Sequence, residues 1–306
     1  MASDVTDDFV LEKCEYFTAV QLWPVRIEIN PRLWLDNFEE HERMHARYLL
    51  NSFLYLSSSI TQHMVIDNFE ALSRLVALPY DGTSKGKLRW EHFASTLRVV
   101  IVRGEEVRPT DSGYLFSRIA RDALDIQEDR IMDAPEAVKA LDEGLDAPII
   151  FVDDFVGSGD QFLDTWTRRW DVNNHSVSFA ELSARKSGHY IYCPVLATES
   201  GVKAISDLHP EVNVQPAHEL PASYSVFHPQ SLVWPDELRS TATEFIRAAS
   251  ARAGIPDTDG GTDDWRGYNK LGLTIAFAHG VPDATIPLFW WESETWNPLK
   301  KRHREP

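Results

Sequence analysis

The sequence predicts an α/β fold built on a parallel sheet, and two stretches of the chain carry that prediction. Residues 97–102 (Leu-Arg-Val-Val-Ile-Val) and 149–152 (Ile-Ile-Phe-Val) are mostly apolar runs of strand length. Each run is followed by a polar segment that contains glycine, and then by apolar residues at helical spacing. Apolar strands that alternate with helices are typical of a parallel sheet covered on both faces. A third apolar run at residues 189–197 continues the alternation.

The first part of the chain predicts helices. Apolar residues recur at helical spacing over residues 32–78, with a break at residues 57–59. Before them, residues 25–29 alternate as in a short edge strand or an extended arm. Residues 79–86 have the glycine and proline content of a loop. We therefore expect residues 1–90 to form a helical N-terminal module.

The expected α/β core occupies residues 91–256. Its last element is a helix over residues 236–254, with a proline before it and a glycine at its end. Residues 257–306 contain one more apolar run, at residues 271–277, and a segment rich in proline and tryptophan. We expect this C-terminal part to pack on the core.

The composition indicates a globular protein and excludes several classes. The 306 residues are 43% hydrophobic and include ten tryptophans, whereas the net charge of −17 argues against a broad nucleic-acid surface. Acidic residues 257–264 fit a solvated loop better than a cation site, and basic residues 300–304 fit a frayed end better than a docking handle. Two cysteines, no apolar signal core and no long apolar run favour a cytoplasmic protein without a membrane segment.

The chemistry of the sequence is concentrated after the apolar run at residues 149–152. Asp153 and Asp154 follow the run, and a Gly-Ser-Gly turn and a helical pattern come next. A strand, a glycine turn and a helix direct backbone N–H groups and a helix N-terminus at one point, which suits a phosphate. The two acids would reach hydroxyls or a hydrated cation beside it. Because the lysine of a Walker-type loop is absent, a sugar phosphate is favoured over a nucleoside triphosphate.

Residues 150–161, Ile-Phe-Val-Asp-Asp-Phe-Val-Gly-Ser-Gly-Asp-Gln, resemble the phosphoribosyl-pyrophosphate loop of type I phosphoribosyltransferases. The resemblance implies a Rossmann-like core in which Asp153 and Asp154 are the catalytic acids and face the ribose hydroxyls and Mg²⁺. It also implies a 5′-phosphate cradle made by the backbone of five residues: Gly157, Ser158, Gly159, Asp160 and Gln161. Ser158 and Gln161 stand where the family usually has threonine, and Asp160 adds a negative charge beside the cradle.

A second segment stands in the place of the family's pyrophosphate loop. Asp111, Ser112 and Gly113 come after the apolar run at residues 97–102 and open a helical pattern that includes Arg118. By the resemblance, these four residues would hold a diphosphate, whose release requires cationic groups. A plain turn with a solvent-facing arginine remains an equal alternative.

Residues 34–38, 286–290 and 296–299, together with the loop, resemble phosphoribosyltransferase-like proteins of bacterial conflict and antiphage systems. This subgroup resemblance implies an effector or sensor that works with neighbouring proteins. The implied partners are a phosphoribosyl or nucleotide small molecule and a protein or nucleic acid from a defence operon. His279 and Trp290 would then close over the ligand, or else pack against the sheet.

Three functions remain open from the sequence. The first is an enzyme of phosphoribosyl chemistry, a pentosyl transferase or a nucleotide-depleting enzyme that uses Mg²⁺. The second is a regulator that binds the same ligands without transferring them, which the changed residues Asp160 and Gln161 favour. The third is a scaffold that docks a partner through the helical residues 32–78 and the basic tail.

Overall fold

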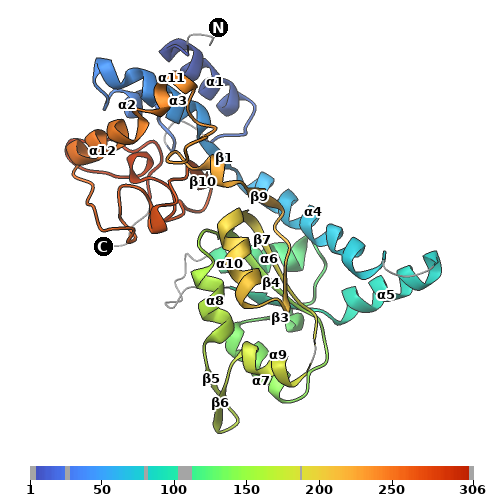
Figure 1. Cartoon of the computed structure of the whole chain (residues 1–306). Helices are drawn as coiled ribbons and strands as arrows, with labels where there is room; N and C mark the ends of the chain where they lie inside the picture. The colour runs from blue at the N-terminus through green and yellow to red at the C-terminus, as the bar shows by residue number, and fades with distance from the viewer. Residues whose placement is uncertain (1–4, 25–27, 79–81, 103–111, 187, 303–306) are drawn as a thin grey trace. The chain divides into compact units, whose positions relative to one another are not determined.

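The chain folds into two compact units (Figure 1), described in a computed structural model for residues 5–24, 28–78, 82–102, 112–186 and 188–302, with residues 112–114 described by backbone only. Unit 1 combines Met1–Ile60 with Pro221–Pro306, and unit 2 is Thr61–Leu220. These bounds differ from the expected division at residues 90 and 256, because the two ends of the chain share one core. Among the described residues, no helix has the length and apolarity needed to cross a membrane.

Unit 1 contains mostly helices and one pair of short strands. The strands β1 and β10 are parallel, with Leu54 opposite Ile275. The elements of unit 1 are α1 (Asp7–Ala19), α2 (Pro31–Leu35), α3 (Arg43–Ser52), β1 (Leu54–Leu56), α11 (Asp236–Arg239), α12 (Ala242–Ala253) and β10 (Ile275–Phe277), with 3₁₀ turns at Glu40–Glu42, Ala222–Tyr224, Tyr268–Lys270 and Pro287–Phe289.

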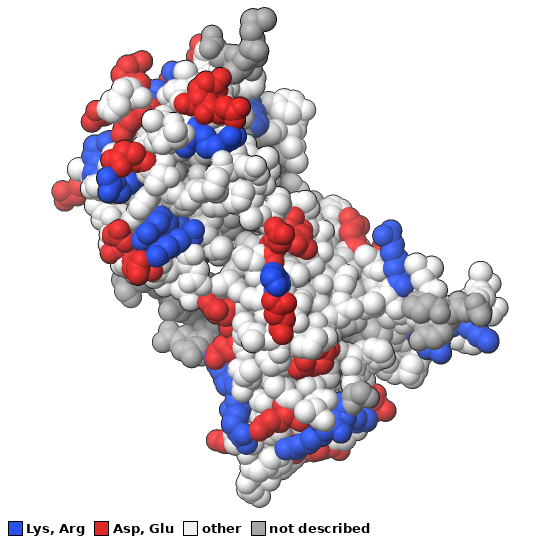
Figure 2. Space-filling model, in the orientation of Figure 1, with Lys and Arg blue, Asp and Glu red and all other residues white. Residues whose placement is uncertain are grey.

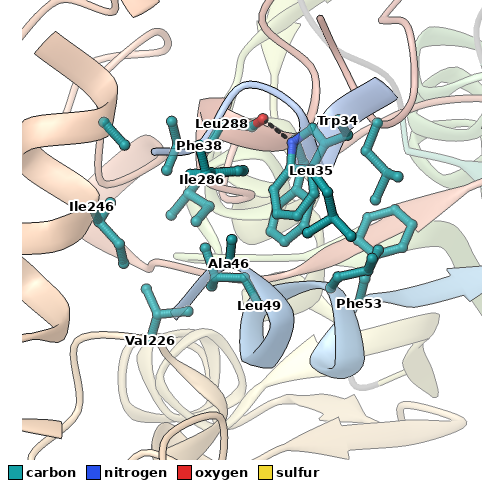
Figure 3. Close-up of a cluster of buried hydrophobic side chains, with 14 of the residues drawn as sticks. Trp34, Leu35, Phe38, Ala46, Leu49, Phe53, Val226, Ile246, Ile286 and Leu288 are labelled. Carbon is teal, nitrogen blue, oxygen red and sulfur yellow. Dashed lines mark hydrogen bonds between the residues drawn. The ribbon is translucent and has the colours of Figure 1, made fainter. Parts of the chain in front are cut away.

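Trp34 joins the two separate pieces of unit 1 (Figure 3). Its indole Nε1 donates a 2.7 Å hydrogen bond to the carbonyl oxygen of Leu288, and its ring stacks on Phe289 with 5.2 Å between centroids. Trp290 is also buried in this hydrophobic core. The proline- and tryptophan-rich end of the chain therefore packs with the N-terminal helices.

The acidic loop at residues 257–264 is organised around a buried carboxylate. Asp264 is fully buried and accepts hydrogen bonds from the backbone N–H groups of Thr258 and Gly260 and from the Arg266 guanidinium. Burial by itself raises the pKa of Asp264, but these hydrogen bonds outweigh burial and hold the pKa well below its ordinary value. The expectation of a solvated loop is therefore wrong for Asp264, which stabilises the turn from inside.

Several other local predictions for unit 1 are corrected. The helical pattern over residues 32–78 is interrupted by β1, because Leu54–Leu56 pair with β10. The helix predicted at residues 236–254 consists of α11 and α12, and it ends at Gly254 with φ of +75° as its C-cap. In the basic tail, Lys300 is buried and Arg302 pairs with Asp283, so these residues are not frayed.

Unit 2 is an α/β domain with a parallel sheet in the order β3-β2-β4-β7-β8, in which β9 also pairs with β7. Every pair of strands in this sheet is parallel, which confirms the predicted fold class. The elements are α4 (Ser58–Val76, beginning in unit 1), α5 (Thr83–Thr96), β2 (Arg98–Ile101), α6 (Ser112–Asp122), β3 (Ile131–Met132), α7 (Ala134–Asp142), β4 (Ile149–Val156), α8 (Asp160–Thr167), β5 (Trp170–Val172), β6 (His175–Val177), α9 (Phe179–Arg185), β7 (Tyr190–Thr198), α10 (Glu199–Leu208), β8 (Val212–Val214) and β9 (His218–Leu220), with a 3₁₀ turn at Glu128–Arg130.

Helices cover both faces of this sheet. Phe151 of β4 contacts Phe162 and Phe179 edge to face on the side of α7 to α10. Its neighbour Val152 points to the other face, where it lines a small apolar cavity together with residues of α4 and α6. The alternation explains why the run at residues 149–152 is apolar without interruption, since both faces of β4 are buried.

Pro194 lies inside the central strand β7, although proline lacks the N–H group that a central strand needs. The first three residues of β7 pair with β8 and the last three with β9. Pro194 falls between these two partners, and its carbonyl accepts a 3.0 Å hydrogen bond from the N–H of Ala217. The missing N–H would point to the same side, into the interruption between β8 and β9, so no pairing is lost.

The surface charge is mixed. On the face drawn in Figure 2, the described residues form small groups of acidic and basic side chains in place of one extended basic area.

Candidate functional site

The candidate site lies at the carboxyl end of β4, which runs through the middle of the unit 2 sheet. β4 continues through Asp153 and Asp154 to Val156 before the chain turns. The neighbouring strand β2 ends beside it, since the N–H of Val102 donates a 3.1 Å hydrogen bond to the carbonyl of Val152. Ligands of open parallel sheets bind at the carboxyl ends of the strands, so this edge is where the two predicted loops belong.

Asp153 is buried beneath this edge, with 3% of its surface exposed. Its Oδ2 accepts a 2.8 Å hydrogen bond from the hydroxyl of Tyr192 on β7, and its Oδ1 accepts one of 2.8 Å from the N–H of Asp154. The Tyr192 ring stacks on Phe162 of α8, with 4.1 Å between centroids. Asp153 therefore ties β4 to β7 and, through Tyr192, to the helix that follows the loop.

The environment of Asp153 disfavours its charged form. Burial raises the pKa of Asp153 well above its ordinary value, and the Asp154 carboxylate beside it raises the pKa further. The hydrogen bonds from Tyr192 and from the Asp154 N–H act in the opposite direction without cancelling the rise. Burial, and then the Asp153 carboxylate, likewise raise the pKa of Tyr192.

Asp154 is less buried than Asp153, and its carboxylate lies beside that of Asp153. The two carboxylates that are adjacent in sequence therefore occupy different environments. Asp153 is fixed by hydrogen bonds within the protein, whereas Asp154 is partly exposed at the edge of the sheet.

The glycine turn between β4 and α8 requires glycine at Gly159. Its backbone has φ of +91° and ψ of −8°, in the left-handed region, and it is the N-cap of α8. A Cβ atom there would lie 3.1 Å from Cγ1 of Ile205 and 3.2 Å from the carbonyl oxygen of Gly201. The turn thus brings the N-terminus of α8 to the same edge as Asp154.

Ser158 and Asp160 contact each other within this turn. The Ser158 hydroxyl donates a 2.6 Å hydrogen bond to Oδ2 of Asp160 and accepts a longer one, 3.4 Å, from the Asp160 N–H. Asp160 and Gln161 are exposed at the first turn of α8. The Asp160 carboxylate therefore lies in the positive potential of the helix N-terminus, where a phosphate would also bind.

The family model PRTase-CE, of phosphoribosyltransferase-like proteins, matches residues 31–302. The chain belongs to the PRTase-CE family. The searches of curated proteins and of solved structures gave no match. The match spans both units, so the family model includes most of unit 1 as well as the phosphoribosyltransferase-like, Rossmann-type core in unit 2.

The acid pair of this PRTase-CE protein fits Mg²⁺ only together with a ligand. Among the residues that the structure describes, no group of three or more His, Cys, Asp or Glu side chains could hold a metal by itself. Mg²⁺ commonly uses one or two carboxylates together with substrate phosphates and water. Asp154 matches that role, whereas both oxygens of Asp153 already accept hydrogen bonds within the protein.

The predicted pyrophosphate loop is described only in part. Asp111 lies outside the described residues, and Ser112 and Gly113 form the start of α6, where only the backbone is described. Arg118 is exposed on the same helix. The role of these residues as a diphosphate site stays a prediction.

Three residues near the PRTase-CE loop were not singled out from the sequence: Tyr192, Thr198 and Gly201. The Thr198 hydroxyl donates a 2.5 Å hydrogen bond to the carbonyl of Gly157, and Gly201 packs directly against that carbonyl. Thr198 is a polar residue at the end of the third apolar strand, as Asp153 is at the end of the apolar run of β4. This position in the sequence could have marked Thr198 as a site residue. Tyr192 carried no signal, because its contact depends on the register of β4 and β7.

Proposed function

We propose that this PRTase-CE protein binds a ligand carrying a ribose 5-phosphate, such as phosphoribosyl pyrophosphate or a nucleotide, together with Mg²⁺. The observation that carries the proposal is the left-handed turn at Gly159, which leads from the acid pair directly into the N-terminus of α8. In the proposed complex, the backbone of residues 157–161 holds the 5′-phosphate, and Asp154 faces the ribose hydroxyls and the cation.

The same geometry suits transfer of the phosphoribosyl group. Bound Mg²⁺ would neutralise charge on a departing diphosphate. The loop would fix the phosphate end of the ribose, and Asp154 would fix its hydroxyl face, so that the bond at the anomeric carbon is held in line for cleavage. Asp153 would act from below, by holding the end of β4 in place. Catalysis of this kind rests on positioning and electrostatic stabilisation, without a covalent nucleophile.

A second candidate function is a sensor that binds such ligands without transforming them. The contact between Ser158 and Asp160 favours it, because the Asp160 carboxylate competes with a phosphate for the N-terminus of α8. A lower affinity for pyrophosphorylated ribose would suit a regulator that responds to changes in a nucleotide pool.

We place either function in a bacterial defence system, in the cytoplasm, with a protein or nucleic-acid partner encoded nearby. Support comes from the subgroup resemblance of residues 34–38, 286–290 and 296–299. In this role an active enzyme would act as an effector that depletes nucleotides, and a sensor would control a neighbouring effector. A scaffold role predicts that changes in the phosphate loop leave defence unaffected.

Calorimetry with phosphoribosyl pyrophosphate, ribose 5-phosphate and nucleotides, with and without Mg²⁺, tests the binding proposal. Product analysis on the same samples separates the two functions, since release of pyrophosphate or a base indicates an enzyme and binding without product indicates a sensor. The double variant Asp153→Asn with Asp154→Asn should lose Mg²⁺-dependent binding. Wild-type binding to none of these ligands would refute the proposal.

A further inference from the structure

We propose that Thr198 is a positioning residue that orients the Ser158 N–H group, one of the backbone donors of the phosphate loop. The inference rests on the proposed phosphate-binding function of residues 157–161 and adds a residue from a different strand and helix. Thr198 is the last residue of β7 and the N-cap of α10.

The register of the sheet brings Thr198 to the loop. Val156 of β4 is paired with Ala197 of β7, so the next residues along the two strands, Gly157 and Thr198, lie beside each other. The Thr198 hydroxyl donates its 2.5 Å hydrogen bond to the Gly157 carbonyl and accepts one of 3.0 Å from the N–H of Gly201. A single hydroxyl thus caps α10 and holds the first peptide of the loop.

The absence of a side chain at Gly201 makes this contact sterically possible. A Cβ atom on Gly201 would lie 2.4 Å from the Gly157 carbonyl oxygen and 2.9 Å from Cγ1 of Val156. Both distances are shorter than non-bonded atoms tolerate, so any larger residue would push the loop away from α10. Gly159 packs against Ile205 of the same helix in a similar way. The loop is therefore seated on the first turns of α10 at two points.

The orientation of the donor follows from peptide geometry. In a planar trans peptide, the C=O and the N–H point in opposite directions. The Gly157 carbonyl belongs to the same peptide group as the N–H of Ser158. Because Thr198 holds that carbonyl toward α10, the Ser158 N–H is turned away from α10, toward the open side of the loop. The donor is then fixed before a ligand arrives, which lowers the entropic cost of binding an anion.

The test compares Thr198→Val, which keeps the shape and removes the hydroxyl, with Thr198→Ser, which keeps the hydroxyl. Inorganic phosphate and phosphoribosyl pyrophosphate serve as probes in calorimetry. We expect the valine variant to bind both about five- to tenfold more weakly, and the serine variant to stay within about twofold of wild type. Thr167→Val is the matched control, since that hydroxyl bonds the Leu163 carbonyl within α8.

A second measurement does not depend on the ligand. In ¹H–¹⁵N spectra of the free protein, the amide signal of Ser158 should shift in Thr198→Val and return to its wild-type position in Thr198→Ser. Thr198→Ala provides the same comparison if the valine variant does not fold.

The outcomes separate this inference from the proposed function. If wild type binds the probes and Thr198→Val binds equally well, the positioning role is wrong while the proposed function stands. If wild type binds neither probe, both are wrong, even where the Ser158 signal shifts. Weaker binding together with a shifted Ser158 signal, both restored by serine, supports the inference.

Discussion

The hydroxyl of Tyr192 donates a 2.8 Å hydrogen bond to Oδ2 of Asp153 and thereby joins β7 to β4 directly beneath the candidate site. The bond is fully buried, and the Tyr192 ring stacks on Phe162 at the start of α8. A conventional assignment would give both acids of the pair the same role toward the ligand. The structure separates them by burial, because Asp153 is buried whereas Asp154 is partly exposed.

Tyr192→Phe should lower the free energy of unfolding by about 1–3 kcal/mol, because Asp153 loses a buried donor while the aromatic stacking is kept. Urea unfolding followed by circular dichroism measures the change. Tyr190→Phe is the control, since it removes a hydroxyl two residues earlier on the same strand and face. Equal losses in both variants would show that the bond to Asp153 contributes nothing particular.

Replacing each of the two acids by alanine should affect a different property of the protein. Asp153→Ala should destabilise the protein by about 1–3 kcal/mol, since it leaves the Tyr192 hydroxyl and the Asp154 N–H without their buried acceptor. Asp154→Ala should change stability by less than about 0.5 kcal/mol but abolish the Mg²⁺ dependence of ligand binding. Thermal unfolding and calorimetry on both variants check this. If Asp153→Ala folds and loses the Mg²⁺ dependence of binding while Asp154→Ala keeps it, then Asp153, and not Asp154, is the acid that faces the cation.

Asp160→Asn should strengthen phosphate binding. Removing one unit charge about 6 Å from a phosphate, at an effective dielectric constant of about 40–80, is worth about 0.7–1.4 kcal/mol, or roughly three- to tenfold in affinity. The gain should shrink at high salt, where exposed charges are screened. Asp164→Asn, one turn further along α8, is the control because its carboxylate pairs with Arg168. Unchanged affinity in Asp160→Asn would show that this carboxylate does not compete with the ligand.

Asp264→Asn should reveal an acid-sensitive contribution to the stability of unit 1. At neutral pH we expect the free energy of unfolding to fall by about 2–4 kcal/mol, because the Arg266 guanidinium and three backbone N–H groups lose their anionic partner. The folded pKa of Asp264 lies below its unfolded value near 3.9, so the stabilisation is complete above about pH 4 and is lost as the pH falls through the folded pKa.

The difference in free energy of unfolding between wild type and Asp264→Asn should therefore become smaller below about pH 4. Urea unfolding at several pH values, followed by tryptophan fluorescence, measures this difference. Asp259→Asn, an exposed residue of the same loop, should stay close to wild type throughout. A difference in free energy of unfolding that stays constant down to pH 2 would contradict the lowered pKa of Asp264.

The α/β core was predictable because its signals are local. The apolar run before Asp153 requires burial on both faces, and the pattern from Phe162 requires a helix, so the strand, turn and helix follow from neighbouring residues. Gly159 could be expected at the turn for the same reason. The family match confirms the phosphoribosyltransferase-like class that these residues indicated.

The remaining features depend on contacts between residues far apart in sequence. Leu54–Leu56 read as part of a helix, since their strand partner lies at Ile275–Phe277. The burial of Asp153 depends on Tyr192, 39 residues away, and on the register of two parallel strands. Asp264 appeared solvated in an acidic segment, because nothing local shows that backbone N–H groups close around it. Each feature that the sequence did not predict depends on a pairing between distant segments or on the burial of a polar side chain.

The divided unit 1 has a consequence for the order of events during synthesis. β1 leaves the ribosome early, but its partner β10 follows 221 residues later, and Leu288 follows Trp34 by 254 residues. At about 5–20 residues per second, the N-terminal helices stay without their core for roughly 11–44 s, while unit 2 can close first. The nascent chain thus exposes an apolar half-domain that a chaperone or a partner could occupy before the last residues arrive.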